Sequence, residues 1–299
     1  MSNIELLFIV PPLNLQLLIN GLLVGALFAL AAYGMALVWG VMNVINIAQG
    51  EFVILGGYVT VLMVESGIPP LYAVIVAPII LYGVGWAIYR TVIHRVVDKD
   101  LFISLLATFG ISILLQQMMN QIFGADIRGA EHGFPSWSMF EGLVTIEQVK
   151  VFAMLISGVI GLILVVFLRK SRTGQAIRAT AQNPRAARIM GINTDRVYAV
   201  TYGLNAAICG AAGALVPMIW AIEPYSGLVY TIRAFMIAII AGLGNLLGVV
   251  IAGLGLGAME NFAGFILGSE FQMAFVFGLL VVILVTRGVR MGRRREILK

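Results

Sequence analysis

The sequence predicts an all-α membrane protein: a single-domain polytopic helix bundle of about eight to ten spans over residues 1–299. Hydrophobic residues make up 61% of its 299 positions and charged residues only 11%. A soluble domain carries about 25% charged residues, so this chain has too little polar surface to face water on all sides. Apolar runs near the ~20 residues that cross a bilayer recur along its whole length.

Nine apolar runs are separated by polar or glycine-rich breaks. They are 15–38, 51–64, 71–89, 101–123, 150–168, 197–221, 229–243, 246–266 and 272–287. The second, seventh and last are short, as expected of tilted, broken or re-entrant helices. Residues 124–149 have the glycine and proline content of an irregular loop or a short interfacial helix. Glycines four apart, as at Gly21 and Gly25 or Gly253 and Gly257, favour close helix packing in lipid.

The basic residues predict how the bundle is oriented. Sixteen of the 19 Lys and Arg residues lie in three segments, 90–99, 169–196 and 287–299. The positive-inside rule places these segments in the cytoplasm, so 287–299 is predicted to be a basic cytoplasmic tail. Nine spans then put the N-terminus outside. Because the basic residues flank apolar runs, the net charge of +5 does not indicate nucleic-acid binding.

Three polar features interrupt the apolar runs, and polar groups are costly inside a bilayer. Residues 43–51, NVINIAQGE, suit either a buried break that lines a cavity or a plain cytoplasmic turn. Residues 240–248 include Asn245 and resemble a counterpart of the first break, as an internal pseudo-repeat would produce. Glu260, followed by Asn261, is either a snorkelling or capping residue or a polar contact on a pathway.

No catalytic or metal-binding motif is present. The sequence has no phosphate-binding glycine loop, no His-Glu-x-x-His and no Gly-x-Ser-x-Gly. One cysteine, Cys209, and two histidines, His94 and His132, provide neither a disulfide nor a metal site. The chain is therefore predicted not to be an enzyme, and any uphill transport must draw on an ion gradient or a partner.

The segment 169–196 is too polar to span the membrane and too long for a tight turn. Residues 174–180 and 186–190 are predicted to form short helices around Asn183-Pro184, with Gly191 as a C-cap. The segment has a small apolar surface made of Ala176, Ile177, Ala179, Ala181, Ala187, Ile189 and Met190. An apolar surface edged by arginines indicates a docking element for a soluble subunit, with a solvated loop as the alternative.

Three stretches resemble the branched-chain amino acid permeases of ABC importers. GQAIRATAQNPRAARIMGIN (174–193) is similar to that family's cytoplasmic coupling loop. VMNVINIAQGEFVILGGY (41–58) resembles its N-terminal motif, and AGLGNLLGVVIAGLGLGAME (241–260) its C-terminal glycine-rich motif. Order and spacing also match, and the resemblance covers essentially the whole chain. It implies a type II importer-like fold in a bacterial inner membrane and transport of branched-chain or related amino acids.

The resemblance also implies partners and site residues. The partners would be a second, related permease, two cytoplasmic ATPases that hold ATP and Mg, and an external substrate-binding protein. This chain itself would bind no cofactor. The residues that would dock an ATPase are Arg178, Ala179, Gln182, Asn183, Pro184, Arg185, Ala186, Ala187, Met190 and Gly191. The candidates for the translocation pathway or gate are Asn43, Asn46, Gln49, Gly50, Glu51, Asn245 and Glu260, with Gln49 standing where the family more often has histidine.

Three alternatives stay open at this point. An ion-coupled secondary transporter would need intramembrane acids, for which Glu260 is the fair candidate. A permease of the same type could instead carry urea, amides or aromatic acids. A purely structural membrane subunit is disfavoured by the polar breaks.

Overall fold

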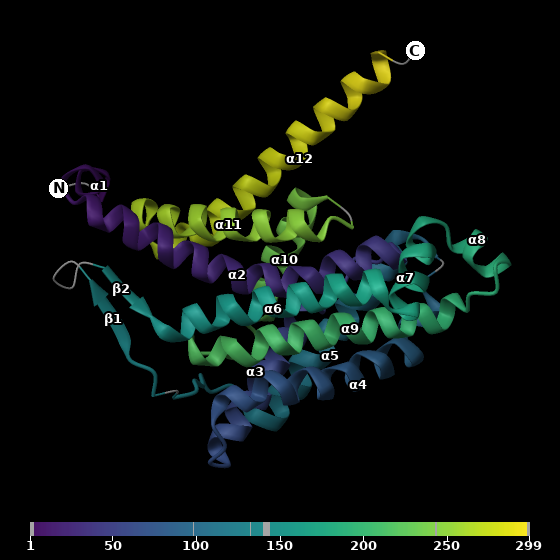
Figure 1. Cartoon of the computed structure of the whole chain (residues 1–299), viewed down its shortest axis with the longest axis horizontal. Helices are drawn as coiled ribbons and strands as arrows, with labels where there is room; N and C mark the ends of the chain where they lie inside the picture. The colour runs from purple at the N-terminus through teal and green to yellow at the C-terminus, as the bar shows by residue number, and fades with distance from the viewer. Residues whose placement is uncertain (1–2, 98, 132, 140–143, 243, 298–299) are drawn as a thin grey trace.

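The computed structural model describes residues 3–97, 99–131, 133–139, 144–242 and 244–297. Most of its helices lie roughly side by side, with a β-hairpin at one end of the bundle and helices α7 and α8 at the other (Figure 1). In chain order the elements are α1 Asn3–Ile9, α2 Pro11–Met42, α3 Gln49–Glu65, η1 Pro70–Tyr72, α4 Ala73–Thr91, η2 Ile93–Arg95, α5 Leu101–Phe123, β1 Ser136–Met139, β2 Val144–Glu147, α6 Gln148–Lys170, α7 Arg172–Gln182, α8 Pro184–Ile189, α9 Thr194–Leu215, η3 Val216–Met218, α10 Gly227–Ala241, α11 Leu246–Leu267, η4 Ser269–Phe271 and α12 Gln272–Ile297.

The predicted all-α polytopic bundle is confirmed. Among the described residues, seven helical stretches are long and apolar enough to cross a membrane. They are Pro11–Met42, Pro70–Arg95, Leu101–Phe123, Gln148–Lys170, Thr194–Met218, Leu246–Leu267 and Ser269–Thr286. The other two predicted runs fall on the shorter helices α3, of 17 residues, and α10, of 15 residues. Helix α12 continues past the predicted span to Ile297 and so extends into the basic tail.

Helix α2 lies at the centre of the bundle. It packs against α6, α9, α10 and α11. In its most apolar stretch of 18 residues, 89% of the residues are buried. Its glycines set the distance to α11, because a Cβ added to Gly25 would lie only 2.5 Å from the carbonyl oxygen of Gly253. The predicted packing role of the paired glycines is thus confirmed for this pair of helices. The outer helices α4, α5, α6 and α12 instead expose many large apolar side chains, as lipid-facing helices do.

The polar interval between α5 and α6 differs from the prediction. It contains an antiparallel hairpin of β1 and β2, in which Trp137 pairs with Ile146, rather than only an irregular loop or a short helix. The β-branched residues of Val144–Glu147 favour an extended strand. The Gln16 side chain fixes the hairpin on α2, since it donates to the Thr145 carbonyl at 2.9 Å and accepts from the Thr145 N–H at 2.7 Å.

Candidate functional site

The chain turns back on itself after α2. Asn43, which is exposed, ends the helix in the left-handed conformation with φ of 52°. Six residues later, the Gln49 side-chain amide donates to the carbonyl of Ala31, in the middle of α2, at 2.8 Å. The segment 43–48 therefore runs back along α2, and α3 begins inside the bundle rather than at its end.

Two threonines satisfy the backbone of this buried segment. The Thr108 hydroxyl donates to the Ile45 carbonyl at 2.9 Å and accepts from the Ile47 N–H at 3.2 Å. The Thr231 hydroxyl donates to the Ile47 carbonyl at 2.9 Å and accepts from the Gly50 N–H at 2.8 Å. Non-helical backbone at membrane depth requires such partners. Of the two sequence interpretations, the structure has the buried break and not the cytoplasmic turn.

A cluster of amides fills the space beside the break. Asn46 and Gln49 are fully buried, and the Asn46 amide donates to the Gln49 side-chain oxygen at 3.3 Å. The Tyr202 hydroxyl donates to the Asn46 side-chain oxygen at 3.1 Å, and the Gln49 amide also reaches the Cys209 sulfur at 2.9 Å. The Asn205 side-chain nitrogen is buried without a hydrogen-bond partner. The structure thus joins two of the predicted pathway residues to polar groups of α9.

Glu51 lies in the first turn of α3 and is fully buried. Its Oε1 accepts from the Ser112 hydroxyl at 3.0 Å and from the Gln116 side-chain amide at 2.7 Å, both in α5. Its Oε2 is buried without a partner, close to the backbone of Gly227. Gly50, Glu51, α5 and α10 therefore meet at one buried polar contact.

Replacing Glu51 tests what this contact contributes. We expect Glu51→Leu to lower the free energy of unfolding by about 1–3 kcal/mol, because the donors of Ser112 and Gln116 lose their acceptor. Glu51→Gln keeps an acceptor oxygen and should stay close to wild type. Thermal unfolding of the purified protein in detergent measures both. Equal losses in the two variants would show that the carboxylate charge, and not hydrogen bonding, is what matters.

A second polar site lies between α10 and α11. The Arg233 Nε donates to both carboxylate oxygens of Glu260, at 3.1 and 3.0 Å, and the Arg233 guanidinium lies 4.7 Å from the Phe28 ring centroid. The sequence interpretation of Glu260 as a snorkelling or capping residue is wrong, since this residue of α11 is buried and ion-paired to Arg233 of α10. Arg233 was not predicted as a site residue. An arginine within an apolar run is the signal that would have identified it.

The second predicted break, around Asn245, differs from the first. Asn245 is exposed, and its side-chain oxygen accepts from the Gly248 N–H at 3.0 Å, which caps α11. Gly242 and Gly244 have φ of 82° and 77°, conformations that favour glycine, while Leu243 lies outside the described residues. The geometry gives Asn245 a capping contact, and its role on a pathway stays a prediction.

The coupling segment, residues 169–196, contains the two predicted short helices as α7 and α8. The Ser171 hydroxyl caps α7 by accepting from the Gly174 N–H at 2.8 Å. The Asn183 side-chain oxygen caps α8 by accepting from the N–H groups of Arg185 and Ala186 at 3.1 and 3.0 Å. Gly191 has φ of 83° and ends the segment as predicted.

Burial divides the predicted docking residues. Ala187 is 5% exposed and Ile177 only 1%. The prediction that these two residues belong to a docking surface is therefore wrong, because both pack inside the chain. Ile189 and Met190, in contrast, are 85% and 81% exposed. Ala179 and Pro184 are half-buried, and the exposed members of the predicted set are Arg178, Gln182, Asn183, Arg185, Ala186, Met190 and Gly191.

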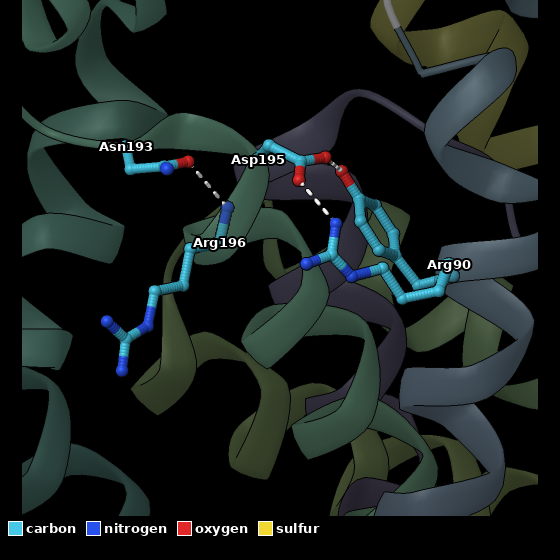
Figure 2. Close-up of polar contacts among 5 residues, drawn as sticks. Arg90, Asn193, Asp195 and Arg196 are labelled. Carbon is cyan, nitrogen blue, oxygen red and sulfur yellow. Dashed lines mark hydrogen bonds and ion pairs between the residues drawn. The ribbon is translucent and has the colours of Figure 1, made fainter.

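The end of the coupling segment is tied to α4 (Figure 2). Asp195, in the first turn of α9, accepts from the Arg90 guanidinium at 2.9 Å and from the Tyr89 hydroxyl at 2.7 Å. The Asn193 side-chain oxygen caps α9 by accepting from the Arg196 N–H at 3.0 Å. The ion pair is half-exposed and adds little stability, but it shows that the basic segments 90–99 and 169–196 lie at the same end of the bundle.

Comparison with known proteins identifies the family. A family model described as "Branched-chain amino acid transport system / permease component" matches residues 17–284. The chain belongs to this family. The match includes the buried break, the coupling segment and Glu260, so all the sites described above lie within the family's shared region.

Curated relatives of the permease agree with this assignment. It is 31% identical to the high-affinity branched-chain amino acid transport system permease protein LivH of Salmonella typhimurium, over 95% of this chain and 97% of that one. It is 30% identical to the corresponding permease protein BraD of Pseudomonas aeruginosa, with the same coverage. No solved structure matches. The relatives are transport permeases and not enzymes, as the sequence predicted.

Proposed function

We propose that the permease is the membrane-spanning subunit of an ATP-binding cassette importer for branched-chain or related amino acids. The observation that carries this proposal is the 31% identity over 95% of the chain with a branched-chain amino acid permease. Substrate would reach the permease from an external substrate-binding protein. Urea, amides and aromatic acids are the substrate classes that a transport assay must exclude.

The proposed partners are a second, related permease, two cytoplasmic ATPases and the external binding protein. ATP and Mg would be held by the ATPases, and no cofactor by this chain. The exposed apolar side chains of Ile189 and Met190 support an ATPase contact, because large apolar side chains at the tip of a polar, arginine-rich element favour a protein partner.

The proposed location is a bacterial inner membrane, with α7, α8 and the C-terminus in the cytoplasm and the N-terminus outside. The positive-inside rule supports this orientation. It is also supported by the contact between Arg90 and Asp195, which brings two of the three basic segments to one end of the bundle.

The proposed mechanism transmits ATPase movement through the coupling segment. Gly174 of α7 packs closely against the backbone of Phe167 and Leu168 at the end of α6. A movement of α7 would therefore be passed directly to α6. The first turn of α9 is tied to α4 through Asp195. A push on α7 and α8 would therefore tilt α6 and α9 together and alternate access to the polar sites.

Reconstitution distinguishes this function from ion-coupled transport. Proteoliposomes with the permease, its partners and internal ATP are expected to accumulate radiolabelled L-leucine after proton and sodium gradients are dissipated. The ion pair of Glu260 with Arg233 disfavours it as a proton or sodium site. Uptake by the permease alone that collapses with an ionophore would contradict the importer proposal.

A further inference from the structure

A cavity of about 330 Å³ lies against α2, α6, α10, α11 and α12. Its lining includes Lys150 at the start of α6, Trp220 just after η3 and Gln272 at the start of α12. The start of α6 and the end of α9 lie at the end of the bundle opposite the coupling segment, because α6 leads into α7 and α9 leads away from α8 (Figure 1). In the proposed orientation the cavity is therefore on the external side, where substrate arrives.

The cavity is lined by basic residues that lie outside the three basic segments. Only three basic residues lie outside the three basic segments, and two of them, Lys150 and Arg233, line this cavity. Their side chains are 13% and 12% exposed, and that of Glu260 is 7% exposed. Lys150 pairs at 2.7 Å with Glu147, which lies outside the cavity lining and is 46% exposed. With Glu147 counted, two basic and two acidic groups balance, so the site and its neighbouring ion pair have no net charge.

Asn20, which lines the cavity, has an unused hydrogen-bond acceptor. The Asn20 side-chain oxygen is buried without a hydrogen-bond partner, although the residue lines the cavity. A buried amide oxygen without a partner is costly and calls for a ligand or a bound water. It accepts hydrogen bonds and so suits a donor such as an ammonium group.

An aromatic wall borders the charged groups. The rings of Phe28 and Trp220 are stacked with centroids 6.1 Å apart, and both residues line the cavity. Ligand pockets commonly have volumes of about 300–1,000 Å³ and combine apolar walls with a few placed polar groups. A volume of about 330 Å³ suits a single amino acid.

On the basis of the proposed importer function, we propose that this cavity is a transit site for one zwitterionic, apolar amino acid. Arg233 and Lys150 would bind the α-carboxylate, Glu260 and the Asn20 oxygen would bind the α-ammonium, and Phe28 and Trp220 would contact the side chain. The ligand would enter between Arg233 and Glu260, exchanging one ion pair for two. Each buried charge then keeps an opposite charge, which avoids the large cost of an unpaired one.

The charge balance predicts selectivity. A zwitterion leaves the site neutral, whereas a net anion or cation lacks one of the two charged groups and leaves protein charges uncompensated. Sites built around charged hydrogen bonds reject analogues that lack a partner by large factors. The site therefore favours amino acids over urea, amides and aromatic acids, the classes left open by the sequence.

Direct binding tests the proposal. The purified complex of both permeases and ATPases, without the external binding protein, is titrated with tritiated L-leucine. We expect saturable binding that L-leucinamide, a cation, and 4-methyl-2-oxopentanoate, an anion, displace at least about tenfold less well than leucine. Absence of saturable leucine binding, or equal displacement by all three compounds, would overturn the proposal.

Variants locate the binding. Asn20→Ala and Glu260→Gln should weaken leucine binding by at least about tenfold, whereas the matched control Glu65→Gln removes a carboxylate paired with Arg128 outside the cavity and should not. If Glu260→Gln fails to fold, the exchanged pair Arg233→Glu with Glu260→Arg keeps an ion pair. It should purify as a monodisperse complex but lose leucine binding, since the two charged groups are exchanged.

These outcomes separate the transit site from the proposed function. If the wild-type importer accumulates leucine but the cavity variants bind it normally, the transit site is wrong and the importer function stands. If the reconstituted importer accumulates urea or aromatic acids and no amino acid, both are wrong.

Discussion

Gly50→Ala is expected to prevent the permease from folding stably. A Cβ at Gly50 would overlap the carbonyl oxygen of Gly227 in α10 and lie 2.8 Å from the Thr231 hydroxyl. Overpacking typically costs about 1–3 kcal/mol, and the cost here is at or above the upper end because a backbone atom must move. The same shift would break the hydrogen bond from the Gly50 N–H to Thr231. The yield of monodisperse protein and its thermal unfolding midpoint in detergent measure the effect.

Gly110→Ala is the matched control for this prediction. Gly110 lies within α5, and a Cβ there meets no atom within 4 Å. The control should fold like wild type, since alanine is favoured over glycine inside a helix. If Gly50→Ala also folds normally, the close contact between α3 and α10 at Gly50 is not required for stable folding.

Ala186→Glu is expected to uncouple the permease from its ATPase without unfolding it. Ala186 is exposed in the first turn of α8, where a carboxylate interacts favourably with the helix dipole. Stability should therefore change by no more than about 0.5 kcal/mol. A buried unpaired charge at the proposed contact would weaken ATPase association by at least about tenfold. Co-purification of the ATPase and uptake of leucine should both fall.

Ala125→Glu provides the matched control at the opposite end of the bundle. Ala125 is also exposed, in the loop after α5. The control should co-purify with the ATPase and support uptake like wild type. Normal association and uptake in the Ala186→Glu variant would instead remove α8 from the docking surface.

Local chemistry made the coupling segment predictable. Pro184 disfavours helix at the residue before it and suits the first helical position after it. Asn183 is a strong N-cap, and Gly191 accepts the left-handed conformation after α8. Each of these effects acts over a few residues, so the helices α7 and α8 could be predicted without knowledge of the fold.

Burial in the same segment could not be predicted in this way. Ile177 and Ala187 look equivalent to Ile189 and Met190 in sequence, but the first two are buried and the second two are exposed. The difference arises because α7, which holds Ile177, packs on α2, α6 and α9, while α8, which holds Ala187, packs on α7 and α9. Which face is covered depends on neighbours distant in the chain.

The amino-acid sequence was enough to predict a membrane bundle, the positions of its apolar helices and its basic segments. Those properties depend on composition and on interactions between near neighbours. The return of 43–48 into the bundle follows from contacts between distant parts of the chain, since Gln49 contacts Ala31 and Thr231 contacts Ile47. The ion pair of Arg233 with Glu260, with Phe28 beside it, likewise joins different helices. Polar groups in a bilayer must find partners, and the partners come from other helices, which no local pattern specifies.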